Sequence, residues 1–345
     1  MSSMWKKRQL TDQILEFRND RETIYAPGRI GKRYVIEDIL SAAGGFGIIF
    51  VAEDLRLLGR KVLVKARRYD REPGLWSIQG DISRNERIQK IRKQIEFEWK
   101  CLVHFRKQGE SRIPNVNDIV EGFSPALNGP HHDLEGKIWY WNDSIVDSEP
   151  YIILQMIEGV NLADYIAEGM KDAYWEGHIL RLAREICTIL SRFHRNYKGQ
   201  YFIYQDLKPA NIMISHEEFF TLIDFGAMTF CQNGMTEYDS HGISTRGYKP
   251  PEMNPQNGLL NTLDNRVDIY GLGATMYYLL TGDDPAKNSE EYPRLSFKKF
   301  DSFNYQKGTV EVVKTALRQE REKRYQSAEE MKNAIIEALK SLTKV

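Results

Sequence analysis

The chain has 345 residues, with 48 lysines and arginines against 48 aspartates and glutamates, and three cysteines. The balanced charge argues against a globally basic nucleic-acid-binding protein and gives no pull toward anionic membranes. The longest apolar stretches, such as Ile269–Leu280, are shorter than the roughly twenty residues that a membrane-spanning helix needs. The cysteines match no metal or disulfide spacing, and no apolar signal core follows the N-terminus. We therefore expect a cytoplasmic protein with reduced thiols that is large enough for two lobes.

Residues 1–30 are expected to form an N-terminal extension. Leu10, Ile14, Leu15 and Phe17 share one face of a possible short helix. A tail helix packed on the following domain is favoured over a docking peptide. Pro27 and Gly28 then end the extension.

A glycine-rich turn, Ala42-Ala43-Gly44-Gly45-Phe46-Gly47, joins a predicted strand at 34–40 to another at 48–52. Glycines between two strands let the backbone approach a polyphosphate and offer its N–H groups to the oxygens. The next predicted strand ends in Lys65. A long amphipathic helix, expected from 86 to about 107, offers Glu96 and Glu98 as acidic partners for that lysine. Residues from about 68 to 85 and from 119 to 147 are expected to be insertions.

The chain is organised around residues 201–226, where polar side chains follow β-like runs. Tyr201–Tyr204 and Ile212–Ser215 flank a polar loop, and Phe219–Ile223 delivers a further carboxylate at its end. The polar residues are Asp206, Lys208, Asn211 and Asp224. Phosphoryl transfer needs such a set: one group orients the attacking hydroxyl, and hard oxygens hold Mg²⁺ on the nucleotide phosphates.

These segments resemble, in order, the motifs of the Hanks-type serine/threonine protein kinases. The run YQDLKPAN followed by DFG resembles the catalytic loop H-R-D-x-K-x-x-N and the metal-binding D-F-G. Gly44, Gly47 and Ile49 match the glycine-rich loop, and the strand ending in Lys65 resembles V-A-I-K. Glu98 is favoured over Glu96 because E-x-x-x-L-x-x-F fits the family's helix pattern. The resemblance covers residues 31–342, and the joint order of its motifs is highly specific.

Two features indicate the serine/threonine branch of the family. Lys208 lies two residues after Asp206, where the tyrosine branch usually has alanine. The segment Ser244–Tyr248 resembles the G-T-x-G-Y loop, and its Thr245 is expected to bridge Asp206 and Lys208.

The resemblance implies an α+β fold of two lobes. Residues 31–156 would form a small antiparallel sheet of five strands with one main helix, and residues 157–345 a larger, mostly helical lobe. It also implies ATP and Mg²⁺, with Mn²⁺ as a possible substitute, and a protein substrate that presents serine or threonine. The substrate's identity, the regulatory input and the oligomeric state stay open.

The resemblance also implies roles for individual residues. Asp206 would orient the attacking hydroxyl, Lys208 would neutralise the γ-phosphate, and Lys65, paired with Glu98, would contact the α- and β-phosphates. Asn211 and Asp224 would hold two Mg²⁺ ions. Leu154 would be the gatekeeper beside the adenine, and backbone groups of Gln155 and Ile157 would bind the purine edge. The other residues expected around the nucleotide are Ala42, Gly44, Gly45, Phe46, Gly47, Ile49 and Leu63.

Three further residues are expected to be structural. Asp268 would accept backbone N–H groups of the catalytic loop, and Glu252 in the segment that resembles A-P-E would pair with Arg324. His194 is favoured as a structural residue over a catalytic one.

Several positions depart from the family pattern. Ala42 replaces the first glycine, which predicts a strained or lifted loop and weaker clamping of the nucleotide. Leu63 replaces the usual alanine and could narrow the purine pocket. Gln205 replaces the arginine that pairs with an activation-loop phosphate. We therefore expect catalysis without phosphorylation of residues 231–244.

Two alternatives remain. Ser41, Ala42 and Leu63 are compatible with a pseudokinase that acts as a nucleotide-binding scaffold. The run Val64–Arg67 and the long segment before the Glu98 helix are compatible with a peptide-modifying kinase related to the kinase domains of lanthipeptide synthetases.

Overall fold

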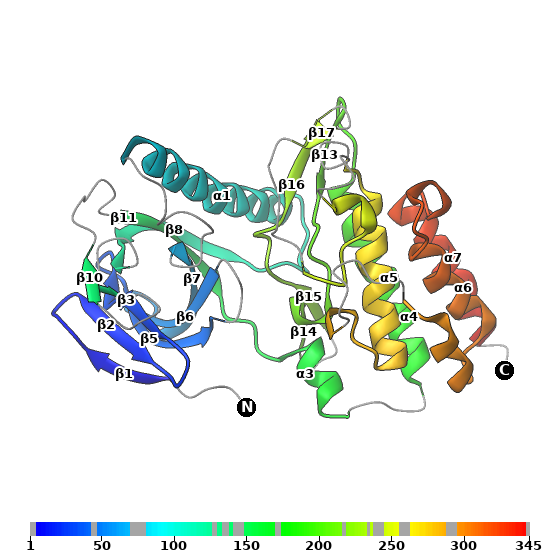
Figure 1. Cartoon of the computed structure of the whole chain (residues 1–345), viewed down its shortest axis with the longest axis horizontal. Helices are drawn as coiled ribbons and strands as arrows, with labels where there is room; N and C mark the ends of the chain where they lie inside the picture. Colours follow the sequence, from blue (N-terminus) through cyan, green and yellow to red (C-terminus); the bar gives the residue numbers. More distant parts are fainter. Residues whose placement is uncertain are drawn as a thin grey trace. The chain divides into compact units, whose positions relative to one another are not determined.

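A computed structural model describes residues 5–42, 47–69, 81–125, 130–132, 138–140, 148–169, 174–215, 219–232, 235–236, 245–254, 263–287 and 295–342. The chain divides into two compact units, Met1–Ile157 and Glu158–Val345 (Figure 1). The first unit combines β-sheets with one long helix, and the second is mostly helical. The predicted fold class is thereby confirmed.

The central sheet of the first unit has six strands in the order β4-β5-β6-β7-β11-β8, all antiparallel neighbours. Five were expected, and the additional strand is the two-residue β4. It forms because Gly31, with a φ of 57°, lets the chain turn back onto β5 at once. The strands are β4 (Arg29–Ile30), β5 (Tyr34–Ser41), β6 (Gly47–Asp54), β7 (Arg60–Arg67), β8 (Val116–Phe123) and β11 (Ser148–Gln155).

The helix predicted near the N-terminus is wrong, because this region forms a separate three-stranded antiparallel sheet. Its strands are β1 (Lys6–Gln9), β2 (Ile14–Arg18) and β3 (Thr23–Pro27). Burial along β2 alternates, with Leu15 and Phe17 inside, so the period is two rather than 3.6. Asn19 stabilises the turn after β2 by accepting the N–H groups of Arg21 and Glu22.

This N-terminal sheet packs on one face of the central sheet and shares its core. The buried side chains include Leu15, Phe17, Ile24 and Ala26 from the N-terminal sheet and Ile48, Phe50, Val62, Val64 and Ile153 from the central one. Successive residues of a strand point to opposite faces. Leu63 and Lys65 therefore lie on the other face of β7.

A single long helix, α1 (Asp81–Lys107), lies against β8 and β11. It begins five residues before the expected start at 86. The apolar residues that recur at helical spacing along α1 are buried, namely Ile88, Ile91, Ile95, Leu102 and Phe105. A hairpin of β9 (Pro130–His132) and β10 (Ile138–Tyr140) occupies part of the second expected insertion.

The second unit is built around α5 (Arg266–Thr281), which is buried along nearly its whole length. Both α4 (Trp175–Phe193) and α6 (Lys307–Ala316) contact it, and α7 (Ala328–Leu342) packs on α4 and α6 (Figure 1). Gly273 is needed where α5 meets the end of α6, because an added Cβ would come within 2.7 Å of the Ala316 Cβ. The short α3 (Leu162–Ala167) begins after the cap residue Asn161, whose side chain accepts the Asp164 N–H.

Two small antiparallel sheets complete this unit. One contains β12 (Val160–Asn161), β14 (Ile212–Ile214) and β15 (Phe220–Leu222), and the other contains β13 (Gln200–Ile203), β16 (Thr229–Gln232) and β17 (Met235–Thr236). The β-like runs expected around the catalytic loop therefore form, each within two residues of its predicted bounds. Short 3₁₀ turns are η2 (Pro209–Asn211), η3 (Pro251–Met253), η6 (Pro285–Lys287), η7 (Phe297–Ser302) and η8 (Arg321–Lys323).

The three cysteines, Cys101, Cys187 and Cys231, are free and buried. Burial raises the pKa of the Cys231 thiol to about 12, so it stays protonated near neutral pH. Within the described ranges, no helix is both long enough and apolar enough to cross a lipid bilayer.

Candidate active site

The loop between β13 and η2 is anchored on the first turn of α5. The carboxylate of Asp268, almost fully buried, accepts the backbone N–H groups of Tyr204 at 2.9 Å and Gln205 at 2.7 Å. His194 lies beside the same carboxylate, with its Nε2 2.8 Å from Oδ2. Asp268 thus makes the contacts expected for it, and His194 lies in this supporting layer behind the loop.

The carboxylate of Asp206 is held by four hydrogen bonds. Its Oδ1 accepts the backbone N–H of Thr245 at 3.0 Å and the hydroxyl of Thr245 at 2.7 Å. Its Oδ2 accepts Lys208 Nζ at 2.8 Å and Asn211 Nδ2 at 2.9 Å. Lys208 also donates to the Thr245 hydroxyl, so this threonine bridges the two residues as predicted. The buried carboxylate is fixed in one orientation, which suits it to position a reacting group.

Asn211 has a defined amide orientation. Its Nδ2 donates to both the backbone oxygen of Asp206, at 2.8 Å, and the Asp206 carboxylate. Since both neighbours are acceptors, the nitrogen must face them. The amide oxygen is then directed to the other side, where it can serve as a metal ligand.

Asp224 is brought to Asn211 by the pairing of β14 with β15. Ile212 lies opposite Leu222, and just beyond this pair the Ile223 N–H donates to the Asn211 carbonyl at 2.8 Å. Asp224 follows directly, with an exposed side chain and a φ of 62°. A positive φ is uncommon outside glycine and is found at sites that the surrounding fold constrains. The two residues predicted to hold metal thus lie at the same end of one hairpin.

Lys65 and Glu98 form a buried ion pair in the first unit, with 2.6 Å between Nζ and Oε1. Glu96 lies elsewhere on α1, at 3.7 Å from Lys100 in an exposed contact. The structure therefore decides between the two acids that the sequence offered.

The family model of the protein kinase domain matches residues 132–344. The chain belongs to the protein kinase family. It is 27% identical over 331 residues to the serine/threonine-protein kinase PknB of Mycobacterium tuberculosis, covering 90% of this chain and 43% of that protein. It is also 27% identical over 276 residues to PknB of Mycolicibacterium smegmatis, covering 75% of this chain and 34% of that protein.

A third relative is the serine/threonine-protein kinase PrkC of Bacillus subtilis, with 25% identity over 257 residues. That alignment covers 74% of this chain and 32% of PrkC. The chain spans less than half of the length of these curated relatives.

Four of the residues expected around the nucleotide, namely Ile49, Leu63, Lys65 and Leu154, share one face of the kinase's central sheet. Strand register places Ile49 opposite Lys65, and Leu63 opposite Leu154. Directly opposed residues lie on the same face, which here is the face of Lys65. Gly47 lies beside the lysine, since an added Cβ would be 3.7 Å from Lys65 Cε. Gly44, Gly45 and Phe46 lie outside the described residues.

Ala42, at the start of the glycine-rich turn, has an ordinary backbone conformation. It does not adopt a positive φ, and its side chain is buried in the core of the first unit. An alanine therefore fits at the end of β5 without the conformational freedom of glycine. The rest of the turn, Ala43–Phe46, lies outside the described residues, so a lifted loop and weaker clamping of the nucleotide stay predictions.

The end of β11 presents backbone groups. The Gln155 N–H is already used, because it donates to the Asn115 carbonyl at 2.9 Å. Only the Gln155 carbonyl could then accept from a purine. Ile157 lies beyond the strand, and within the described part of the chain its backbone makes no hydrogen bond.

Tyr204 supports the D-F-G segment, a role that the sequence analysis missed. It stands where the family often has histidine, and its hydroxyl donates to the carbonyl of Ile223, directly before Asp224. Its ring also lies edge-to-face on Phe225 at 5.4 Å. The sequence did contain a signal for this role: an aromatic residue in the catalytic loop, with Phe193 before it and Phe225 after it. Buried aromatic rings tend to pack against each other, as Phe193 and Phe225 do.

Glu252 and Arg324 form the buried pair that was expected. Two hydrogen bonds of 2.6 and 2.8 Å join the guanidinium to the carboxylate, and both side chains are buried. Gly247, between Thr245 and this segment, has a φ of 81° and packs where an added Cβ would be 2.3 Å from the Pro285 carbonyl oxygen. The backbone between Thr245 and Glu252 is therefore tightly placed.

Proposed function

We propose that this kinase transfers the γ-phosphate of ATP to serine or threonine hydroxyls of a protein substrate. The observation that carries the proposal is the network in which Lys208, Asn211 and Thr245 all bind the Asp206 carboxylate. Lys208 and Thr245 are also the residues that favour the serine/threonine branch. The names of the relatives agree with this assignment.

The available ligand atoms fit Mg²⁺ or Mn²⁺ bound to ATP. Mg²⁺ prefers oxygen ligands and usually takes only one or two from the protein. The Asn211 amide oxygen and the Asp224 carboxylate at one hairpin end match that requirement. The bound metal would neutralise charge on the nucleotide phosphates.

The chain's own residues would do the rest. Asp206 would orient the hydroxyl of the substrate and accept its proton, while Lys208 would stabilise negative charge that develops on the transferred group. Lys65, oriented by Glu98, would bind the α- and β-phosphates. Leu154 and the backbone of Gln155 and Ile157 would contact the purine.

The direct test incubates the protein with ATP labelled on the γ-phosphate, Mg²⁺ and a generic basic protein. We expect phosphoserine or phosphothreonine in the product by mass spectrometry, and none after Mg²⁺ is removed with EDTA. ATP binding without transfer under all conditions would contradict the proposal and favour the nucleotide-binding scaffold.

We further propose that activity does not depend on phosphorylation of residues 231–244. Gln205 is neutral and buried, and within the described ranges its Nε2 has no hydrogen-bond partner. It cannot pair with a phosphate as a guanidinium would. Protein treated with a phosphatase should keep its kcat within about twofold. The same is expected of a variant in which Tyr238 is replaced by phenylalanine and Thr236, Ser240 and Ser244 by alanine. Transfer that appears only after modification of this segment would contradict the prediction.

The Lys65–Glu98 pair allows a matched comparison on one helix. Glu98→Gln removes a buried charge-assisted hydrogen bond, which corresponds to a loss of about 10- to 100-fold in kcat/KM for ATP. Glu96→Gln removes an equal charge from an exposed contact and should leave kcat/KM unchanged. Equal effects of the two substitutions would show that the ion pair does not position Lys65 for the nucleotide.

A further inference from the structure

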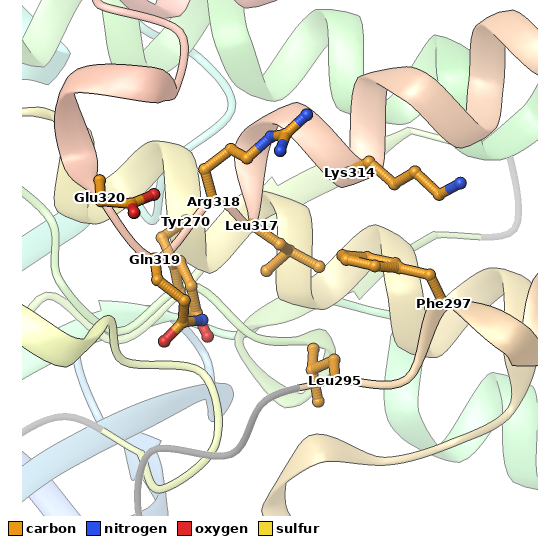
Figure 2. Close-up of a pocket in the computed structure, with 8 residues that line it drawn as sticks. All are labelled: Tyr270, Leu295, Phe297, Lys314, Leu317, Arg318, Gln319 and Glu320. Atoms are coloured by element: carbon orange, nitrogen blue, oxygen red, sulfur yellow. The ribbon is translucent and has the colours of Figure 1, made fainter.

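A cavity of about 580 Å³ lies in the second unit, away from the catalytic loop (Figure 2). Tyr270 on α5 contributes to its wall, and Asp268 on the same helix anchors the catalytic loop. Residues two positions apart in an α-helix point in directions that differ by about 200°, so the side chains of Asp268 and Tyr270 leave α5 on nearly opposite sides. The cavity is therefore separate from the catalytic residues of this unit.

The wall combines an apolar surface with positive charge. Figure 2 shows Leu317 in the middle of the lining, with Phe297 on one side and Tyr270 on the other. Lys314 Nζ lies 5.8 Å from the centroid of the Phe297 ring. Arg318, on the turn after α6, adds a second cation and is exposed.

The charge of Arg318 acts on the nearby Glu320 carboxylate, but neither cation forms an ion pair among the described residues. Within the part of the chain that the structure describes, neither Lys314 nor Arg318 has a carboxylate within ion-pair distance. Glu320 also lines the cavity, but it contacts Lys323 at 3.4 Å. The rim therefore carries a net positive charge.

The turn that forms this rim is fixed from behind by a buried side chain. Arg324 donates to the carbonyls of Arg318 at 2.7 Å and Gln319 at 3.1 Å while it binds Glu252. A preformed wall loses little conformational freedom when a ligand binds, which favours affinity.

We propose that this cavity is a docking site for an acidic segment of a protein substrate. A large apolar side chain of that segment would lie against Leu317 and Phe297, and flanking carboxylates would pair with Lys314 and Arg318. The volume is in the range of about 300–1,000 Å³ that ligand sites occupy. The occupant is assigned by charge complementarity, since the rim offers two cations and an apolar floor. This inference rests on the proposed function, because a docking site selects substrates only if the chain phosphorylates them.

The first experiment measures binding to the full chain, independently of catalysis. The probe is a fluorescein-labelled peptide with a Glu-Asp-Leu-Phe-Glu-Glu core between Gly-Ser flanks, and fluorescence anisotropy gives its Kd. The double variant Lys314→Glu with Arg318→Glu should weaken binding by about tenfold or more. Lys307→Glu with Lys340→Glu reverses the same number of charges, at two exposed positions that do not line the cavity, and should leave the Kd unchanged.

One altered peptide tests the charge of the probe, and one further protein variant tests the apolar surface of the cavity. A peptide with lysines in place of its acidic residues should not bind, and Phe297→Ala should weaken binding of the acidic peptide without a charge change. Equal binding by the wild type and the Lys314/Arg318 variant would overturn the proposal. A second result would also overturn it: the wild type does not bind the peptide, and the Lys314/Arg318 variant differs from the wild type in its mass by analytical ultracentrifugation. The surface would then join two copies of the chain.

The second experiment separates docking from catalysis. An acceptor serine peptide is fused to the acidic core, and its phosphorylation is compared with that of the same acceptor alone. In the Lys314/Arg318 variant the KM of the fused substrate should rise by about tenfold with kcat unchanged, and the lone acceptor should be unaffected. Peptide binding without any phosphorylation would support the docking site and contradict the proposed kinase activity. Phosphorylation with equal KM values for both substrates in the wild type would overturn the docking site alone.

Discussion

Asp206→Asn is expected to lower kcat by about a thousandfold, the largest effect on activity that we predict. The asparagine has nearly the same volume but is neutral and retains only one acceptor oxygen. In the structure both carboxylate oxygens accept hydrogen bonds, from Thr245 on one side and from Lys208 and Asn211 on the other. Whichever way the new amide is placed, its NH₂ group faces at least one of these donors. The variant therefore loses both the orienting charge and part of the network.

The measurement compares initial rates of γ-phosphate transfer at saturating ATP. Asp301→Asn is the matched control, since it makes the same chemical change at an exposed position and should retain the wild-type rate. Thermal unfolding checks that Asp206→Asn is folded, and we expect its Tm to fall by no more than about 10 °C. A folded Asp206→Asn protein with more than about a tenth of the wild-type kcat would contradict the assigned role.

Arg324→Ala is expected to destabilise the second unit by about 3–5 kcal/mol, the largest effect on stability that we predict. The substitution leaves the Glu252 carboxylate buried without its cation. It also removes donors from the carbonyls of Arg318 and Gln319 and a cation from the face of the Tyr270 ring. The Tm of this unit should fall by on the order of 10 °C in calorimetry.

Two controls show whether the ion pair is responsible. Lys323→Ala removes a neighbouring cation whose partner Glu320 is exposed, so its Tm should be within about 2 °C of the wild type. In the double variant Glu252→Ala with Arg324→Ala, no buried charge is left unpaired, so the loss should be smaller than the sum of the two single losses. Strictly additive losses would show that the two side chains stabilise the unit independently.

The sequence predicts the catalytic loop well because its chemistry is local. Asp206, Lys208 and Asn211 lie within six consecutive positions, so any fold that orders this loop brings them together. The apolar runs on both sides form β13 and β14, and the third forms β15 next to β14. Strand pairing then places Asp224 beside Asn211.

Other residues of the site needed the tertiary structure. The sequence offered Glu96 and Glu98 as partners of Lys65, and only the resemblance to the family's helix pattern favoured Glu98. Residues two positions apart on a helix point about 200° apart, so both cannot face the lysine. Only the packing of α1 on the sheet decides that Glu98 faces the lysine. Tyr204 shows the same dependence, because its support of the D-F-G segment depends on contacts with Ile223 and Phe225 that spacing does not reveal.

The N-terminal region shows how a pattern can mislead. Leu10, Ile14 and Phe17 fit a helical period, whereas the strand β2 uses the alternation of Leu15 and Phe17. A short run fits both periods, and the deciding energy is the burial of this strand against the central sheet, which is not a local property.

The amino-acid sequence by itself therefore determined the family, the fold class and the polar residues of the catalytic loop, because these depend on residues close together in the chain. The tertiary structure alone decided the partner of Lys65, the N-terminal sheet and the cavity beside Tyr270. That cavity collects side chains from α5, η7, α6 and the turn that follows α6. Its apolar floor and its two cations become one surface only when helices distant in sequence pack against each other.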